Sequence, residues 1–196
     1  MNVHSISDIM PRSQKQFSEL RDRSRQKILA SALELFAEQG FGSTQVSAIA
    51  RKAGVAAGLL YNYFDGKEDL LKTIVRSAQD DVSALVDEIL EKPETRDLET
   101  FADSALLSMQ SHQKNWRVLM RVMLQPEARK VARGAEGGFE KHLARAVKSL
   151  RPKTGGKPGF TDKEITEILH SIIIVYIITE NIKLARRLIA LLATRR

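Results

Sequence analysis

The stretch from Gln45 to Phe64, QVSAIARKAGVAAGLLYNYF, contains two short helical patterns separated by a glycine. The apolar residues of its first half recur at helical spacing: Val46, Ile49, Ala50 and Ala53. Gly54 follows them and predicts the end of this helix, because glycine adopts a positive φ without steric cost. A second helix begins at about Ala56. The spacing fits a helix-turn-helix whose second helix enters the DNA major groove, and it also fits an ordinary αα-hairpin.

A longer pattern from Arg25 to Leu71 decides between these two interpretations. It consists of LF-x-x-x-GF at residues 35–41, IA-x-x-AGV at 49–55 and LY-x-YF-x-x-K-E at 60–68. Together these motifs resemble the N-terminal domain of the TetR family of transcriptional regulators. The resemblance covers the first third of the chain. It implies an all-α fold, with an N-terminal three-helix helix-turn-helix domain and a larger C-terminal helical domain for effector binding and dimerisation.

We therefore expect three regions along the chain. Residues 1–21 lack a sustained period and predict a mobile N-terminal arm, which either enters the minor groove or is a solvated tail. Residues 22–72 form the expected DNA-binding domain, with the helix-turn-helix at 45–64. Residues 73–196 form the C-terminal domain. Apolar residues keep helical spacing from Leu70 to Leu90, so one long helix should join the two domains without a flexible linker.

Start and stop signals define the remaining helices. Ser43 or Thr44 should cap the first helix of the helix-turn-helix, and Asp65 with Glu68 resembles a capping box for the long helix. Thr161 with Glu164 is a second capping box. Further helices are expected over residues 24–39, 98–111 and 115–124, from 126 to about 150 with a possible break at Gly134, Gly137 and Gly138, from 162 onward, and from 181 to about 193.

Composition excludes several classes of protein. The 196 residues are 43% hydrophobic and 28% charged, as in ordinary globular domains. The chain has no cysteine, and its 4 histidines are scattered, so neither a catalytic constellation nor a metal site is expected, nor a cofactor. The start lacks a signal-peptide pattern and the longest apolar run is too short to span a membrane, which is compatible with a cytoplasmic protein.

The net charge of +7 suggests a polyanionic partner, but its distribution does not locate that partner on the helix-turn-helix. Residues 114–160 carry 12 Lys and Arg against 3 Asp and Glu, whereas residues 1–70 carry 9 against 8. The expectation of DNA binding therefore rests on the motif and not on the charge.

The resemblance implies DNA contacts within residues 44–67, mostly to phosphates. The expected residues are Thr44, Gln45, Ser47, Ala57, Leu59, Tyr61, Asn62, Tyr63 and Lys67. Tyr61 and Tyr63 could instead belong to the core, and Lys67 could be an ordinary surface lysine. Because Ala57 and Leu59 offer no side-chain hydrogen bonds, A·T steps and DNA shape should contribute more to specificity than guanine contacts.

The C-terminal domain should bind an effector and a second subunit. The soft side chains Phe101, Met109, Trp116, Met120 and Met123 could line an effector pocket, although such residues are more often core. Residues 172–178 are apolar on every face, so a partner should cover one face, with Ile173, Ile177, Leu184 and Leu188 at the dimer interface. The expected function is a ligand-responsive repressor that binds a palindromic double-stranded operator as a homodimer, and the alternative is an effector-independent architectural DNA-binding protein.

Overall fold

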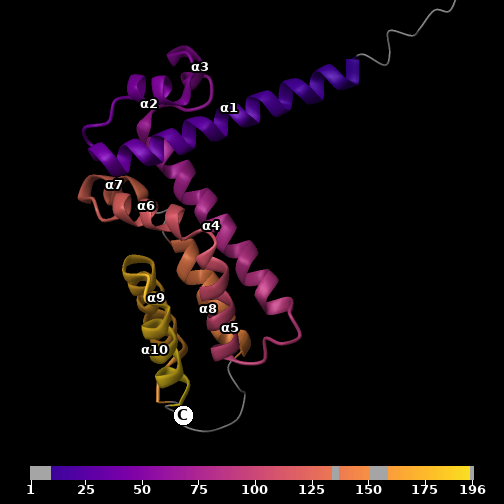
Figure 1. Ribbon diagram of the computed structural model, residues 1–196, viewed down its shortest axis with the longest axis vertical. Coiled ribbons are helices and arrows are strands. Elements are labelled where there is room, and N and C mark those ends of the chain that lie inside the picture. Colours follow the sequence, from indigo (N-terminus) through magenta and orange to yellow (C-terminus); the bar gives the residue numbers. More distant parts are fainter. Residues whose placement is uncertain (1–9, 134–136, 151–158, 195–196) are drawn as a thin grey trace, which may run out of the picture. The chain divides into compact units, whose positions relative to one another are not determined.

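The computed structural model describes residues 10–133, 137–150 and 159–194. Over these ranges the chain forms ten helices and no strand, which confirms the predicted all-α class (Figure 1). The helices are α1 (Met10–Gln39), α2 (Val46–Ala53), α3 (Ala57–Tyr61), α4 (Lys67–Glu91), α5 (Leu98–Gln110), α6 (Gln113–Met123), α7 (Pro126–Ala132), α8 (Gly137–Leu150), α9 (Asp162–Thr179) and α10 (Ile182–Thr194). The chain divides into two compact units between Ile74 and Val75.

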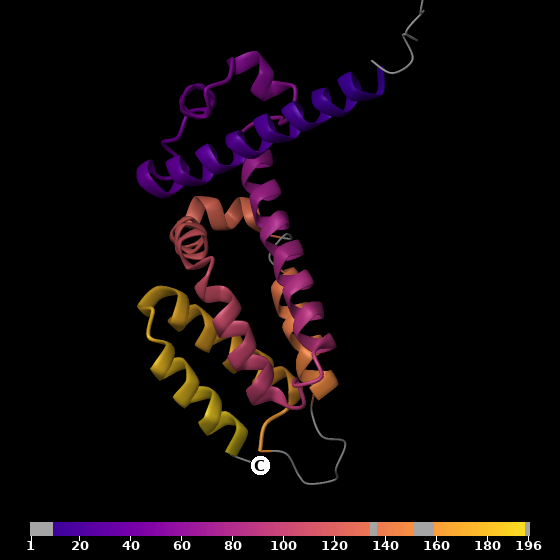
Figure 2. The ribbon, with the colours of Figure 1, turned by 45° about the vertical axis from the view of Figure 1, so that its right-hand side comes forward.

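The N-terminal unit is built on α1, with α2 and α3 on the same side of it (Figures 1 and 2). Each helix contributes fully buried side chains to one core, including Ile28 and Phe36 from α1, Ile49 from α2, Leu60 from α3 and Leu70 from α4. Burying a side chain of this size contributes about 1.5–3 kcal/mol. This core fixes α2 and α3 to α1 and leaves their outer faces free.

The turn of the helix-turn-helix has the geometry expected from its glycine. Gly54 has φ +70° and ψ +33°, in the left-handed region. The Val55 N–H donates to the Ala50 carbonyl over 3.0 Å, and the Gly54 N–H donates to the Arg51 carbonyl over 3.2 Å. These bonds satisfy the last carbonyls of α2 and set the angle at which the chain enters α3.

The beginning of α1 differs from the predicted mobile arm. Residues 10–21 are helical and extend α1 to 30 residues, while residues 1–9 lie outside the described ranges. Pro11 is tolerated there because the N–H groups of a first helical turn have no partner inside the helix. The extension carries the exposed side chains Phe17 and Leu20, and this lack of burial explains why it has no clear apolar period.

Two of the predicted helix caps are also wrong. The hydroxyl of Thr44 does not cap α2, because Gln45 occupies the N-cap position and makes no side-chain cap bond. Asp65 does not form the predicted box with Glu68. Its backbone N–H donates instead to the Asp69 carboxylate, over 3.2 Å. At the start of α4, the side chain one residue beyond Glu68 thus makes the hydrogen bond, whereas no side chain caps α2.

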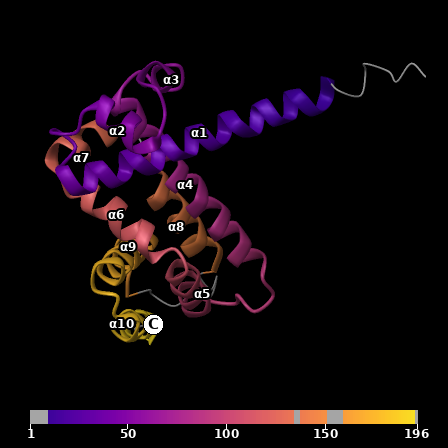
Figure 3. The same cartoon turned by 45° about the horizontal axis from the view of Figure 1, so that its top comes forward.

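The C-terminal unit packs α5, α8, α9 and α10 with the second half of α4 (Figure 3). Its core contains Ile89 from α4, Phe101 from α5, Val147 from α8, Leu169 from α9 and Ile189 from α10. Because α4 also contributes Leu70, Leu71 and Ile74 to the N-terminal core, one continuous helix belongs to both units. This confirms the predicted long helix from Lys67 to Glu91.

In the C-terminal unit, the observed helix caps and helix breaks agree better with those predicted from the sequence. The predicted Thr161–Glu164 capping box is present at the start of α9, and an Asp97–Thr100 box, which the sequence analysis missed, starts α5. The break predicted as possible between residue 126 and about 150 is present, and it divides this stretch into α7 and α8. Gly134 lies outside the described residues, whereas Gly137 and Gly138 open α8.

Candidate nucleic-acid interface

The outer face of α2 and α3 presents most of the residues expected to contact DNA. Gln45 and Ser47 are exposed at the N-terminus of α2, and Ala57 is exposed at the start of α3. Asn62 is exposed at the C-cap of α3, whereas Leu59 is half-buried. These side chains lie on a surface formed by two short helices whose inner faces are held by Ile49 and Leu60. The arrangement offers a small protruding surface with few polar groups.

The two tyrosines at the end of α3 have different surroundings. Tyr61 is 58% exposed, which excludes a core role and leaves its hydroxyl available to a partner. Tyr63 is half-buried, its ring lies 6.3 Å from that of Phe64, and the guanidinium of Arg21 lies 6.0 Å from its centroid. A cation over an aromatic face at this distance contributes about 0.5–1 kcal/mol at an exposed site. Arg21 therefore connects the extended part of α1 to the end of the helix-turn-helix.

Thr44 and Lys67 are engaged inside the fold. Thr44 is 2% exposed, and its hydroxyl donates to the Gly40 carbonyl over 2.7 Å. The Lys67 ammonium donates to the carbonyls of Phe41 and Gly42 over 3.0 and 2.8 Å, and lies 3.5 Å from that of Thr44. Of the nine residues expected to contact DNA, these two have side chains directed at the backbone between α1 and α2. The sequence contains no direct signal for the Lys67 contacts, because they join residues 23 to 26 positions apart.

A charged contact that the sequence analysis missed also holds α2 against α1. Lys52 in the last turn of α2 lies 3.0 Å from the Glu34 carboxylate and 3.4 Å from that of Glu38. The hydrogen bond to Glu34 is the main cause that raises the pKa of Lys52. The two glutamates are one helical turn apart on α1, and this i, i+4 pair of acids could have suggested a basic partner.

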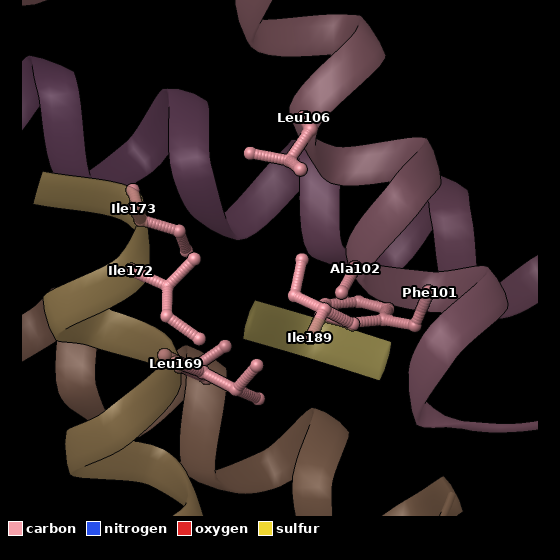
Figure 4. A pocket seen from close by; sticks show the side chains of 8 residues that line it. Phe101, Ala102, Leu106, Leu169, Ile172, Ile173 and Ile189 are labelled. Atoms are coloured by element: carbon pink, nitrogen blue, oxygen red, sulfur yellow. The ribbon is translucent and has the colours of Figure 1, made fainter. Parts of the chain in front are cut away.

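The residues expected to line an effector pocket do not share one cavity. Phe101 and Met109 are buried in the core, Trp116 and Met120 pack against it, and Met123 is half-buried. Phe101 alone among the five lines the internal cavity shown in Figure 4, together with Leu106, Leu143, Leu169, Ile172, Ile173, Ile189 and Ala102. This apolar cavity measures about 10 Å³, close to the size of a single water probe. The sequence could not identify its other walls, because they come from helices far apart in the chain.

One buried polar atom lies near this core. Tyr176 on α9 is 1% exposed, and the described part of the chain supplies no hydrogen-bond partner for its hydroxyl. Burial raises the pKa of Tyr176, and the nearby Glu180 carboxylate raises it further. The hydroxyl is therefore neutral near pH 7 and can both donate and accept a hydrogen bond.

The outer face of α9 and α10 carries exposed apolar side chains. Ile177, expected at a dimer interface, is 5% exposed and belongs to the core of its own chain, and Ile173 lines the internal cavity. Leu184 is exposed and Leu188 half-buried. The exposed apolar residues of this outer face are Val175, Ile178, Leu184 and Leu191. Beside them lies an open groove of about 370 Å³, which is lined by Glu167, Ile168, Ser171, Ile172, Val175 and Leu188. Helical periodicity could not separate the two faces of α9, because both are apolar.

Histidine and carboxylate side chains, which could support catalysis or metal binding, also occur in the C-terminal unit. The His170 ring packs at a tilt against Phe139, with ring centroids 4.8 Å apart. Burial lowers the pKa of His170, although Glu140, 3.6 Å away, has the opposite effect. Within the described ranges no cluster of three or more His, Asp or Glu side chains is suited to hold a metal ion. None of the helices in these ranges is long and apolar enough to cross a membrane.

Comparison with known proteins connects this geometry to a family. The family model described as "Bacterial regulatory proteins, tetR family" matches residues 28–74, which include α2, Gly54 and α3. The HTH-type transcriptional regulator SrpR of Pseudomonas putida is 41% identical over 58 residues, which is 30% of this chain and 27% of SrpR. The fatty acid metabolism regulator protein of Bacillus subtilis is 46% identical over 50 residues, which is 26% of each chain. The matched segments thus span about a quarter of these relatives.

The fold of the whole chain is similar to that of solved regulators. The transcriptional regulator FadR from Bacillus subtilis, solved in complex with stearoyl-CoA, has a TM-score of 0.64 at 21% identity and is covered over 98% of its length, with 87% of this chain. The similarity therefore extends over both units, although at this identity it shows the fold alone. The chain thus carries a helix-turn-helix segment that matches the model of the bacterial TetR family over residues 28–74, and its fold is similar to that of solved transcriptional regulators.

Proposed function

We propose that the protein is a ligand-responsive transcriptional repressor that binds a palindromic DNA operator as a homodimer. The observation that carries the proposal is the exposed α2–Gly54–α3 surface within the segment that matches the family. A buried inner face and an exposed outer face are what a helix needs to be held by a domain and still enter a groove. Because its partner is chromosomal DNA, we place the protein in the cytoplasm.

The exposed residues suit two kinds of DNA contact. Gln45 and Ser47 at the start of α2 and Tyr61 at the end of α3 carry polar groups that can hold phosphate oxygens and set the register. Ala57 and Leu59 can contact thymine methyl groups, and Asn62 can pair with adenine. Since α3 carries no charged side chain, we expect A·T steps and DNA shape to determine much of the specificity.

A two-fold dimer would double this surface. The exposed Val175, Ile178, Leu184 and Leu191 give α9 and α10 an apolar outer face, and helical pairs of this kind can form a four-helix bundle with a second copy. The two recognition helices would then meet half-sites one or more helical turns apart on a palindrome. A dimer bound across a promoter would block transcription. A reporter gene placed behind the operator should therefore be more active in a strain from which the gene for this protein has been deleted.

The effector is proposed to act through the C-terminal unit and α4. For a ligand to release DNA, it must bind the DNA-free state more tightly than the DNA-bound one, and a hundredfold preference corresponds to about 2.7 kcal/mol. Because α4 contributes to both hydrophobic cores, a shift of its C-terminal half would reach the N-terminal unit. Most of the basic excess lies in residues 114–160, and α6 and α7 carry the exposed Lys114, Arg121 and Arg129, which would suit an anionic headgroup.

Trp116 gives a direct test of this effector binding. It is the only tryptophan and packs against the C-terminal core, so its fluorescence should change when a ligand enters. Acyl-CoA thioesters of increasing chain length serve as the first probe, because they join an apolar tail to an anionic headgroup. We expect at least one to shift the Trp116 emission and to release a fluorescent operator duplex. The Trp116→Phe variant should release the duplex at the same concentration without the emission change.

A second candidate function is supported by the size of the internal cavity. The cavity measures about 10 Å³ and is too small for an organic ligand in this conformation. An architectural DNA-binding protein has no effector to bind, so this conformation would be sufficient for its function. The two functions separate in the same experiment. If neither acyl-CoA nor a broad metabolite set alters Trp116 emission or operator occupancy while wild-type protein binds DNA, the architectural function replaces the effector-responsive one.

A further inference from the structure

An ion pair joins α6 to the end of α9 and leaves both of its members accessible to water. The Arg117 guanidinium on α6 donates to the carboxylate of Glu180, the C-cap residue of α9. The two helices lie side by side (Figure 3), and the two side chains are 52% and 48% exposed. Solvent screens an ion pair with this exposure, so it is weak. A second carboxylate could therefore compete with Glu180 for the guanidinium.

Glu180 is held at this place by an uncommon backbone conformation. Its φ is +58° and its ψ +11°, and among the described residues it is the only one besides glycines with a positive φ. The left-handed region is unfavourable for a residue with a Cβ atom, so glycine is the usual choice for a helix end of this geometry. Glutamate here accepts backbone strain and supplies a carboxylate to Arg117, and strain of this kind is often found at functional sites.

Two polar atoms without partners occur one helical turn from the ion pair, one on each helix. Tyr176 precedes Glu180 by four residues on α9, and Gln113 precedes Arg117 by four residues on α6. The Tyr176 hydroxyl and the Gln113 amide nitrogen are both buried, and neither has a hydrogen-bond partner in the part of the chain that the structure describes. Burial raises the pKa of Tyr176 and the Glu180 carboxylate raises it further, so this carboxylate lies near the hydroxyl. Both unpaired groups would gain from an additional acceptor.

The same face of α6 also carries apolar side chains. Residues at the spacing i, i+3, i+4 and i+7 share one helical face, and on α6 these are Gln113, Trp116, Arg117 and Met120. Trp116 and Met120 are partly buried and pack against the C-terminal core. This face thus combines an amide and a guanidinium, which both donate hydrogen bonds, with an apolar surface. A ligand that suits it has an acidic group and an apolar tail.

We propose that Arg117 anchors the carboxylate of an apolar effector, and that this carboxylate takes the place of Glu180. A carboxylate can accept two parallel hydrogen bonds from a guanidinium. The displaced Glu180 carboxylate would accept a hydrogen bond from the Tyr176 hydroxyl, and the Gln113 amide would donate to the effector. One ion pair thus replaces another, and two unpaired donors gain acceptors. The inference rests on the proposed ligand response and names the chemical class of its effector, a monocarboxylic acid with an apolar tail.

The exchange would also provide the room that this effector needs. The small internal cavity is not lined by either member of the ion pair. The carboxylate can instead approach the half-exposed Arg117 from solvent, and loss of the bond to Glu180 would release α6 from the end of α9. The apolar tail could then pack against Trp116 and Met120 on the inner face of α6.

Binding of decanoate, measured by calorimetry and by Trp116 emission, tests the site without DNA. Arg117→Met removes the guanidinium, and Arg145→Met is the matched control, because Arg145 forms an equally exposed ion pair with Asp87. We expect decanoate to bind the wild type and Arg145→Met equally and Arg117→Met at least about tenfold more weakly. Methyl decanoate, which has no charge, should not distinguish Arg117→Met from the wild type. No binding of decanoate to the wild type, or equal binding to Arg117→Met, would overturn the proposal.

The exchange predicts the opposite effect for its other member. Glu180→Gln keeps the shape of the side chain and an acceptor for Tyr176 but removes the competing charge, so decanoate should bind it several-fold more tightly than the wild type. An ion pair with a purely structural role predicts unchanged or weaker binding, and that result would overturn the exchange. This variant keeps the test decisive even if Arg117→Met does not fold.

Tyr176→Phe gives a further readout. It removes the donor that Glu180 gains in the exchange, so decanoate should bind it several-fold more weakly than the wild type. An affinity equal to that of the wild type would contradict the exchange.

Operator release separates this inference from the proposed function. If decanoate binds through Arg117 but the wild type has no operator affinity, the carboxylate site is supported and the repressor function is refuted. If acyl-CoA releases the operator from the wild type and from Arg117→Met at the same concentration, and decanoate binds neither, the proposed function holds and the carboxylate site is overturned.

Discussion

At the scale of single residues, the hydroxyl of Tyr176 is the buried polar group whose removal should help the fold. It is desolvated and has no partner within the described ranges, and leaving such a group unpaired costs about 1–3 kcal/mol. Tyr176→Phe keeps the ring and removes the cost, so we expect stability to rise by about 1 kcal/mol and the melting temperature by about 2–4 °C. Differential scanning calorimetry measures both.

The matched control for this change is Tyr61→Phe. The Tyr61 hydroxyl is exposed to water, so its loss should leave the melting temperature unchanged. A destabilised Tyr176→Phe variant would show that the hydroxyl has a partner in solution, supplied by water or by residues outside the described ranges.

At the scale of elements, the Gly54 turn should tolerate a side chain poorly for reasons of backbone geometry alone. A Cβ atom at Gly54 would meet no atom within 4 Å, yet φ is +70°. Gly54→Ala should therefore cost about 1–2 kcal/mol, the price of a left-handed conformation for an L-residue. Gly58, in α3, also has open space around it but has no positive φ, so Gly58→Ala should stabilise the fold by up to about 1 kcal/mol. Urea unfolding of the two variants should give shifts of opposite sign, and equal shifts would refute this account of the turn.

The capping box of α9 should make its stability depend on pH. The Glu164 carboxylate accepts hydrogen bonds from the Thr161 backbone N–H at 2.7 Å and hydroxyl at 2.8 Å, and the backbone bond is the main cause that lowers the pKa of Glu164. A pKa lowered in the folded state means that the contribution is complete above the ordinary carboxyl pKa of about 4.3 and is lost as the pH falls through the lowered value. The difference in melting temperature between wild type and Glu164→Gln should therefore be constant near neutral pH and shrink below about pH 4.3. A pH-independent difference would contradict the cap.

Helices and turns were predicted better than contacts between helices. The reason is that helices and turns depend on residues close together in the sequence, whereas contacts between helices do not. Periodicity and the Gly54 signal placed α2 and the turn, because these depend on residues a few positions apart. The helical extension of α1 was missed, since its exposed residues give no apolar period. The contacts of the Lys67 ammonium with the Phe41 and Gly42 carbonyls join distant parts of the chain, and the walls of the internal cavity come from different helices. No local sequence pattern predicts either of them. For Ile177, periodicity could not choose between two apolar faces of α9.

At the scale of the whole molecule, the outer face of α9 and α10 should be covered by a second copy. Ile178 is 51% exposed in the single chain, and Ile178→Asp would place an unpaired carboxylate in the interface at a cost of several kcal/mol. We expect a monomer by light scattering, with an unchanged circular dichroism spectrum. Leu107→Asp, at an equally exposed position on α5, is the control and should remain dimeric. A dimeric Ile178→Asp variant would place the interface elsewhere.

The most direct test of the proposed function is selection of binding sites from a random duplex library by the wild-type protein. The account predicts an inverted repeat with A·T-rich half-sites, because two copies of α3 read them with alanine, leucine and asparagine side chains. In parallel, Asn62→Ala should lower the affinity for the selected site more than for random DNA, as the loss of a base contact does. Enrichment of no sequence, or of a single unrepeated site that Asn62→Ala binds as well as the wild type, would contradict a dimeric operator-binding repressor.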